Sequence, residues 1–231
     1  MKKLALHSCC APCLLGVMQA LQTSSGPTQA QNKQQLGKAQ NALQDYDQIT
    51  AIFFNPNIEP SDEYDRRLIA FSEYVSSHHI DSFVVDKSEL SSLLGNLTVP
   101  APSLSVGMAE NSTIGSKSPV VSNNVRCWNC YLQRLARVAQ WAHENSYDGF
   151  ATTLSISPWQ NQAAINEAGR QVSEQFSQLP FVAYDFRDYY KISQRKAREL
   201  GIYCQNYCGC LPSKGEADQQ RMQRRSARKG P

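Results

Sequence analysis

The strongest constraint on the fold is an alternation of short apolar runs with stretches of helical periodicity. The apolar runs cover residues 3–8, 49–54, 80–85, 150–156 and 181–186, and all but the first are rich in β-branched and aromatic residues, as strands are. Capping residues and apolar spacing predict helices at residues 14–21, 61–78, 127–145 and 193–200. Strands that alternate with helices form a parallel sheet covered on both faces. The sequence therefore predicts an α/β fold.

Two polar segments interrupt this pattern. Residues 23–47 are rich in Gln, Ser, Asn and Lys, and residues 95–124 lack any periodicity, so both are expected to be insertions. The rest suits a single domain over residues 1–213, followed by a basic tail at 214–231 that we expect to be flexible. No apolar run approaches the roughly 20 residues of a membrane span, and the N-terminal run is too short for a signal peptide. A cytoplasmic protein without a membrane partner is expected.

Eight cysteines fall into small groups from distant parts of the chain: Cys9, Cys10 and Cys13; Cys127 and Cys130; Cys204, Cys208 and Cys210. Adjacent cysteines rarely reach the geometry of a disulfide, whereas thiolates gathered in groups hold zinc or iron–sulfur clusters. Ligands of parallel sheets bind beyond the carboxyl ends of the strands, and Cys9 and Cys10 directly follow the first strand. We therefore expect a metal or redox site at that edge.

Four of these thiols match the ligand set of a [4Fe–4S] cluster: Cys9, Cys10, Cys127 and Cys130. The C-x-x-C of Cys127 and Cys130 is expected to open a helix, whose free N–H groups stabilise thiolates. The same four residues could bind structural zinc or remain unliganded. Motif shape favours iron and sulfur, because structural zinc sites usually combine two C-x-x-C pairs.

The Cys208-Gly209-Cys210 segment has a different character. A one-residue glycine spacer can close into a strained disulfide, and strained disulfides are the redox-active ones. A second metal site and a pair of buried cysteines are the alternatives. Cys13 is either a spare ligand or a packed core residue.

Polar residues that follow the predicted strands would converge on the same crevice: Asn55, Asn57, Thr153 and Ser157. Asp185 follows another apolar run and could ligate a hard metal, transfer a proton, or form a surface pair with Arg187. Neither a GxxxxGK[ST] nor a GxGxxG loop is present, so bound ATP or NAD is not expected. The net charge of +3 permits a nucleic-acid partner.

Taken together, these motifs resemble those of the QueH-type epoxyqueuosine reductases. The matching stretches are HSCCAPC (7–13), FFNPNIEPSDEYDRR (53–67), RCWNCYLQRLARVA (126–139), FATTLSISPWQN (150–161), YDFRD (184–188) and YCQNYCGCLPS (203–213). They follow the family's order along nearly the whole chain, and the two polar insertions lie outside them. The combination of a C-C pair, a C-x-x-C and a C-G-C is highly specific.

The resemblance implies an oxidoreductase that reduces the epoxide of epoxyqueuosine in the tRNA anticodon loop to queuosine, the last step of queuosine formation. It implies a fold related to nucleotide-binding sandwiches and a [4Fe–4S] cluster on Cys9, Cys10, Cys127 and Cys130, with room for an additional iron ion. It also implies a redox-active Cys208/Cys210 pair. An external electron donor would be required.

Deoxygenation of an epoxide consumes two electrons and two protons, and the leaving oxygen needs a proton donor or Lewis acid. Asp185 and Tyr64 are the candidates for that role. Anticodon bases can stack on aromatic side chains such as Trp159, and arginines, among them Arg134 and Arg187, could contact phosphates. A zinc-stabilised RNA-binding module and a tRNA sulfur-transfer enzyme that carries persulfides remain alternatives.

Overall fold

A single parallel sheet forms the centre of the molecule. The computed structural model describes residues 1–23, 45–86, 123–176 and 179–228. Within them the sheet contains β1 (Lys3–His7), β2 (Gln48–Phe53), β3 (Ser82–Val84) and β4 (Gly149–Thr152), in the order β3-β2-β1-β4. Ala5 of β1 lies between Thr50 of β2 and Phe150 of β4. Leu4, Ala5 and Leu6 are fully buried, as expected of a central parallel strand covered on both faces.

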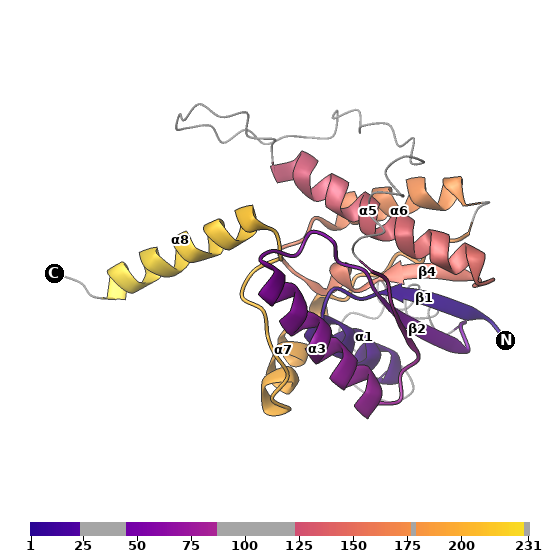
Figure 1. Cartoon of the computed structure of the whole chain (residues 1–231), viewed down its shortest axis with the longest axis horizontal. Helices are drawn as coiled ribbons and strands as arrows, with labels where there is room; N and C mark the ends of the chain where they lie inside the picture. The colour runs from indigo at the N-terminus through magenta and orange to yellow at the C-terminus, as the bar shows by residue number, and fades with distance from the viewer. Residues whose placement is uncertain (24–44, 87–122, 177–178, 229–231) are drawn as a thin grey trace.

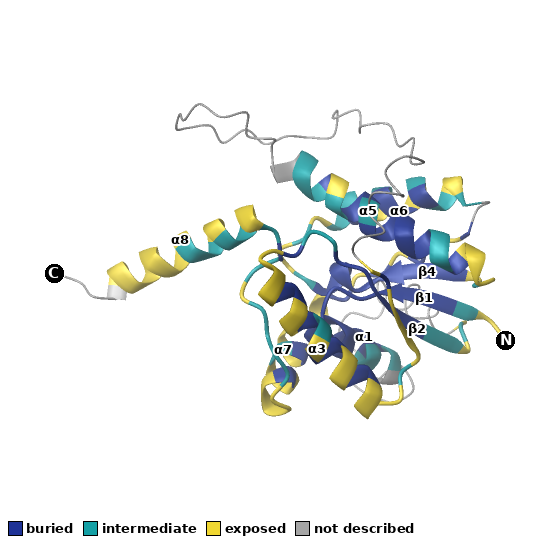
Figure 2. Ribbon diagram, in the orientation of Figure 1, coloured by how far each residue is buried: buried dark blue, intermediate teal, exposed yellow. Residues whose placement is uncertain are grey.

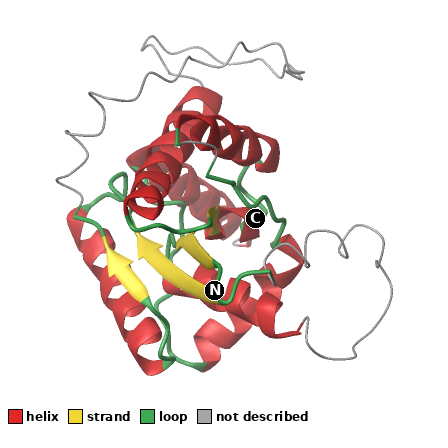
Figure 3. Cartoon of the chain, turned by 90° about the vertical axis from the view of Figure 1, so that its right-hand side faces the viewer, coloured by secondary structure: helices red, strands yellow, loops and turns green. Residues whose placement is uncertain are grey.

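Helices cover both faces of this sheet, which confirms the predicted α/β class (Figures 1 and 3). The helices are α1 (Ala11–Thr23), α3 (Ser61–Ser77), α5 (Asn123–Glu144), α6 (Gln162–Gln175), α7 (Tyr190–Glu199) and α8 (Leu211–Arg228), with short 3-10 turns η2 (Thr153–Ile156) and η3 (Arg187–Tyr189). Helices α1, α3 and α7 lie on one face, and α5 and α6 on the other. The buried residues line the strands and the inward faces of these helices (Figure 2).

Two expected strands differ in the structure. The run at 150–156 is strand only to Thr152, whose Oγ1 accepts a hydrogen bond from the N–H of Leu154 (3.1 Å) and starts the turn η2. The strand expected at 181–186 is reduced to one bridge, between Phe150 and Phe181. Because β4 has already ended, the chain after Val182 has no strand to pair with, and the N–H of Phe186 instead donates to the carbonyl of Ser155.

Helix boundaries also differ from expectation. Helix α5 begins at Asn123, so Cys127 and Cys130 lie inside the helix and not at its free N-terminus. Ser193 does not cap α7. It is buried within that helix, where its hydroxyl donates to the carbonyl of Tyr190 (2.9 Å), and it faces α1 so closely that a Cβ at Gly16 would lie 2.7 Å from its own Cβ.

Helix α6 was missed, although its buried residues Ile165, Ala168 and Val172 have helical spacing. Residues 211–228, expected to belong largely to a flexible tail, form helix α8, which projects from the body of the molecule (Figure 1) and exposes most of its length (Figure 2). The division into one domain and a tail stays a prediction. Most of the two expected insertions, residues 24–44 and 95–122, lies outside the described residues. None of the described helices is long and apolar enough to span a membrane.

Candidate active site

Three segments meet at the carboxyl ends of β1, β2 and β4. The side chain of Asn55, after β2, donates to the carbonyl of Ser8 after β1 (2.9 Å). The N–H of Cys9 donates to the hydroxyl of Thr153 in η2 (3.1 Å), and both residues are buried. The structure therefore brings Cys9, Asn55 and Thr153 together, as expected for the ligand-binding edge of a parallel sheet.

A cluster of three buried thiols lies at the start of α1. The sulfur atoms of Cys9, Cys10 and Cys13 all lie within 4.8 Å of one another, close enough to hold a metal ion. Hydrogen bonds from Cys10 and Cys13 lower the pKa of Cys9, whereas burial raises the pKa of Cys10. Hydrogen bonds to Cys10 and Cys9, together with burial, raise the pKa of Cys13. Of the three thiols, Cys9 is therefore the one whose surroundings favour the thiolate form.

The C-x-x-C motif approaches from the opposite face of the sheet. Cys127 and Cys130 are three residues apart on α5 and so share one side of the helix. Burial raises the pKa of both thiols, that of Cys130 to about 11, and the positive charge of Arg134 opposes this shift at Cys130. Trp128, inside this motif, and Tyr131, directly after it, are buried and not available to stack on a base.

Arg134 lies among the thiols and not at the surface. Its side chain is only 1% exposed, and burial acts to lower its pKa while thiolates at Cys130, Cys208, Cys9 and Cys210 raise it. Its Nε has no hydrogen-bond partner among the described residues. Arg134 is therefore a buried cation facing a group of potential anions, and its expected contact with tRNA phosphates stays a prediction.

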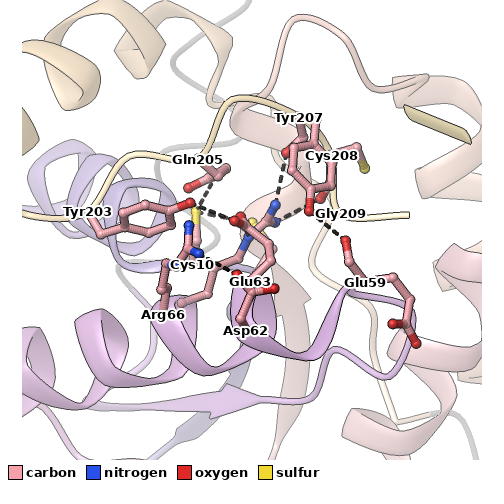
Figure 4. Close-up of polar contacts among 12 residues, drawn as sticks. Cys10, Glu59, Asp62, Glu63, Arg66, Tyr203, Gln205, Tyr207, Cys208 and Gly209 are labelled. Atoms are coloured by element: carbon pink, nitrogen blue, oxygen red, sulfur yellow. Dashed lines mark hydrogen bonds and ion pairs between the residues drawn. The ribbon is translucent and has the colours of Figure 1, made fainter. Parts of the chain in front are cut away.

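The segment 203–210 completes the site (Figure 4). Gln205 donates to the sulfur of Cys10 (2.8 Å), and Gln160, after η2, donates to the sulfur of Cys208 (3.1 Å). Cys208 and Cys210 are unpaired, half-buried thiols. Together with the electrostatic contacts of Arg134, these bonds place the C-G-C segment beside the other two cysteine groups.

Comparison with known proteins identifies the family. The family model described as "Epoxyqueuosine reductase QueH" matches residues 35–100 and 110–216, which include Cys127, Cys130, Cys208 and Cys210. The chain belongs to this family. Proteins named epoxyqueuosine reductase QueH from Streptococcus pyogenes (30% identical over 89% of this chain and 68% of its own), Thermotoga maritima (33%, 69% and 76%) and Acinetobacter baylyi (29%, 95% and 84%) are similar to it. The QueH family is one of oxidoreductases, so the enzyme class expected from the sequence is confirmed.

The two residues expected to provide a proton have different surroundings in this QueH-family chain. Asp185 is half-exposed and forms an ion pair with Arg187, whose hydrogen bonds lower the pKa of the carboxyl. A surface pair with Arg187 is one of the three roles that the sequence left open for Asp185. Tyr64 is buried in α3 and packs edge-on against Phe53 (5.6 Å between ring centroids), and burial raises its pKa.

The expected substrate-binding residues fall into buried and exposed groups. Asn55 and Thr153 are buried supports of the thiol loops, and Asn57 donates to Gln133 (3.2 Å). The hydroxyl of Ser157 accepts from the N–H of Trp159 (3.3 Å), and the Trp159 side chain is 80% exposed. Trp159 therefore remains available to an external ligand, next to the residue that contacts Cys208.

Sequence reasoning missed several residues that support the thiols. His7 ends β1 fully buried, with Nδ1 against the hydroxyl of Thr152 (2.9 Å) and Nε2 against the carbonyl of Phe54 (3.1 Å). Burial lowers its pKa to about 4, so the ring is neutral at pH 7. A histidine that directly precedes the C-C pair was the available signal. Nothing in the local sequence marked Gln160 and Gln205, because their contacts are made across the fold.

Gly209 supplies the first prediction. Its φ of +140° is rare for other residues, and an added Cβ would lie 3.0 Å from Cγ1 of Ile58. We expect Gly209→Ala to lower the free energy of unfolding by about 1–3 kcal/mol and to impair turnover, because the segment must shift away from Ile58. Denaturant unfolding and an activity assay measure the two effects.

The matched control is Gly201→Ala. Gly201 also has a positive φ (+69°), but a Cβ there would meet no atom within 4 Å. It should lose stability through backbone strain and keep its turnover. Equal turnover in the two variants would show that the position of the C-G-C segment does not matter.

Proposed function

We propose that this protein reduces the epoxide of epoxyqueuosine in the anticodon loop of tRNA, giving queuosine. Family membership supports the proposal, and so does the meeting of three cysteine groups from distant parts of the chain. The observation that carries it is the approach of the C-G-C segment to the other thiols: Gln205 donates to the sulfur of Cys10 (2.8 Å), and Gln160 donates to that of Cys208 (3.1 Å). This is the arrangement that a site for electron transfer to one substrate requires.

The redox balance can be met by the chain's own dithiol. Conversion of the epoxide to the alkene releases its oxygen as water and consumes two electrons and two protons. Oxidation of Cys208 and Cys210 to a disulfide supplies two electrons and two protons. An external electron donor must then reduce this disulfide before the next turnover.

The thiols outside this pair fit an iron–sulfur group. Cys9, Cys10, Cys127 and Cys130 would hold the [4Fe–4S] cluster, which supplies electrons one at a time when bound. Such a cluster with four thiolates is anionic, and the buried cation with an unpartnered Nε, Arg134, is suited to stabilise it. Cys13 lies within 4.8 Å of Cys9 and Cys10 and is available to the additional iron.

Tyr64 is the better of the two candidates for protonating the leaving oxygen. A phenol is protonated at neutral pH, and burial raises the pKa of Tyr64 further. Asp185 is held ionised by Arg187, so its carboxylate is a poor acid and suits a metal ligand or a base better.

Exposed residues around the site would bind the tRNA. Trp159 would stack on an unpaired anticodon base, because its ring is exposed beside Gln160, the neighbour of Cys208. Helix α8 carries exposed arginines that would meet phosphates: Arg221, Arg224 and Arg225. Arg187 would contribute a further phosphate contact. A cytoplasmic location follows from a tRNA substrate and reduced thiols.

The proposed role of α8 predicts a salt effect. We expect affinity for an anticodon stem-loop to fall steeply with salt, and the triple variant Arg221→Gln/Arg224→Gln/Arg225→Gln to bind more weakly. The slope of log K against log[salt] should decrease by about 0.7–0.9 for each phosphate that is no longer neutralised. Fluorescence anisotropy at several salt concentrations measures both quantities.

Arg170→Gln is the control for this binding experiment. Arg170 is an exposed arginine on α6 that pairs with Glu167 and Glu174, so its loss changes the net charge without touching α8. It should leave the salt slope unchanged. If the triple variant behaves like Arg170→Gln, the α8 arginines are ordinary solvated surface charges.

The function itself is tested by turnover. Anaerobically purified protein, supplied with a chemical reductant, should convert a stem-loop that carries epoxyqueuosine to the queuosine form, which mass spectrometry detects as the loss of one oxygen atom. The isolated epoxyqueuosine nucleoside should react far less efficiently at equal concentration. An unchanged stem-loop in the presence of iron-loaded protein would contradict the proposal.

A further inference from the structure

We infer that the buried Glu63–Arg67 ion pair of α3 is a positioning device for Cys208. The pair touches none of the expected reacting atoms. It binds the backbone carbonyls of Tyr207 and Cys208, and it binds the hydroxyl of Tyr203 at the start of the same segment. The inference deepens the proposed function, and it rests on that function only where it assigns Cys208 a part in the reduction.

Arg67 binds two successive carbonyls of the cysteine segment. Its side chain is 2% exposed; Nη1 donates to the carbonyl of Cys208 (2.8 Å) and Nη2 to that of Tyr207 (3.0 Å). Its guanidinium also lies 5.4 Å from the centroid of the Tyr207 ring. The planar, forked shape of guanidinium lets it fix two acceptors at once, which the single ammonium of lysine cannot reproduce.

The two carboxylate oxygens of Glu63 bind different partners: one binds Arg67, and the other binds Tyr203 at the start of the cysteine segment. Its Oε1 accepts from Nε of Arg67 (2.7 Å), and its Oε2 accepts from the hydroxyl of Tyr203 (2.6 Å). Figure 4 shows Tyr203 and Cys208 on either side of Glu63. Each group of the ion pair therefore has a second partner in the segment that carries the thiol.

Glu59, two residues before α3, adds two contacts through its backbone. The N–H of Glu59 donates to the carbonyl of Gly209 (2.8 Å), and the hydroxyl of Tyr207 donates to the carbonyl of Glu59. The sulfur of Cys208 faces a different partner, Gln160, at 3.1 Å. Cys208 is thus fixed through its carbonyl by α3, while its thiol is directed toward the cysteine site.

The burial of this ion pair indicates that its main role is to position the cysteine segment and not to stabilise the fold. Taking both charges out of water is costly, and apolar residues of similar volume often stabilise a fold as well or better. One residue earlier on α3, Arg66 and Asp62 form a pair with the same spacing that is more than half exposed. A surface pair of that kind contributes little. The Glu63–Arg67 pair is set apart by its three hydrogen bonds to the cysteine segment, in addition to the bond between the two side chains.

The test measures the reactivity of Cys208 directly. The full-length protein, purified anaerobically, is alkylated for short times, and the tryptic peptide 199–214 is sequenced by mass spectrometry. This peptide also contains Cys204, which donates to the carbonyl of Ile202 and serves as internal reference. In Arg67→Lys and Glu63→Gln, we expect Cys208 to be alkylated about tenfold faster relative to Cys204, the effect of losing a buried hydrogen bond to a charged group.

The expected kinetic signature is a decrease in kcat with little change in KM, because the thiol is misplaced while the tRNA surface is intact. Tyr203→Phe is a milder variant that leaves no buried charge unpaired, and its effect should be smaller and in the same direction. Val172→Ala, a core truncation in α6 far from the segment in sequence, controls for general loss of stability.

Two results would overturn the inference. One is an equal rise in alkylation at Cys204 and Cys208 in the α3 variants, which would indicate general loosening. The other is the same relative change in Val172→Ala. Because alkylation is measured without turnover, its outcome is independent of the proposed function. An active Cys208→Ala enzyme would contradict the redox role of Cys208, but it would not change the conclusion that the ion pair positions this residue.

Discussion

Replacing Cys127 or Cys9 by serine is expected to remove most of the iron from anaerobically purified protein. The physical reason is that the cluster depends on four thiolates, and a serine hydroxyl is a poor substitute for a soft sulfur ligand. Iron and sulfide analysis, with the absorption spectrum, measures the loss. Cys9 is one of the thiols whose charge acts on Arg134, and Cys127 lies on α5 with Cys130, which is another of them, so iron should be lost from either variant.

Cys204→Ser is the control for this experiment. Cys204 is a half-buried thiol close in sequence to the C-G-C segment, and its S–H donates to the carbonyl of Ile202. It should keep its iron. A Cys127→Ser protein that retains full iron and brown colour would show that the cluster is not held by the C-x-x-C of α5.

The second large effect concerns the C-G-C segment. Cys208→Ala and Cys210→Ala should each abolish formation of queuosine and leave the iron content close to that of the unmodified protein. A dithiol that provides both electrons cannot work with one sulfur, while the cluster ligands lie on α5 and at the start of α1. Product formation is followed by mass spectrometry of the digested stem-loop.

Cys204→Ala again serves as the matched control, since it removes a thiol four residues before Cys208. It should retain activity. Normal activity in the double variant Cys208→Ala/Cys210→Ala would show that the dithiol is not the reductant and that the two electrons come from another group.

The central sheet could be predicted from the sequence because its strands are local signals. The runs around Leu4, Ile52 and Phe150 are apolar, the last two are also β-branched and aromatic, and each is buried in the structure. The run around Tyr184 has the same composition but is not a strand, because a strand forms only where a neighbouring strand is present for hydrogen bonding. Its neighbour β4 ends at Thr152, where a side-chain hydrogen bond turns the chain.

The cysteines of the candidate site could be predicted and the charges around them could not. Their grouping indicated one ligand set of Cys9, Cys10, Cys127 and Cys130, and the resemblance to the QueH family added the Cys208/Cys210 pair. Arg134 and Arg67, in contrast, read as surface residues of amphipathic helices, as most arginines are. Their burial depends on partners that are distant in sequence: Cys9 and Cys208 for Arg134, and the carbonyls of Tyr207 and Cys208 for Arg67.

The most direct test of the account is a single turnover without an external donor. Protein reduced anaerobically and freed of reductant is mixed with an equimolar stem-loop that carries epoxyqueuosine, and the products are quantified together. The account predicts that queuosine and a disulfide between Cys208 and Cys210 form in equal amounts, with one disulfide for each epoxide reduced. Queuosine formed while both thiols stay free, or a disulfide formed with the epoxide intact, would contradict it.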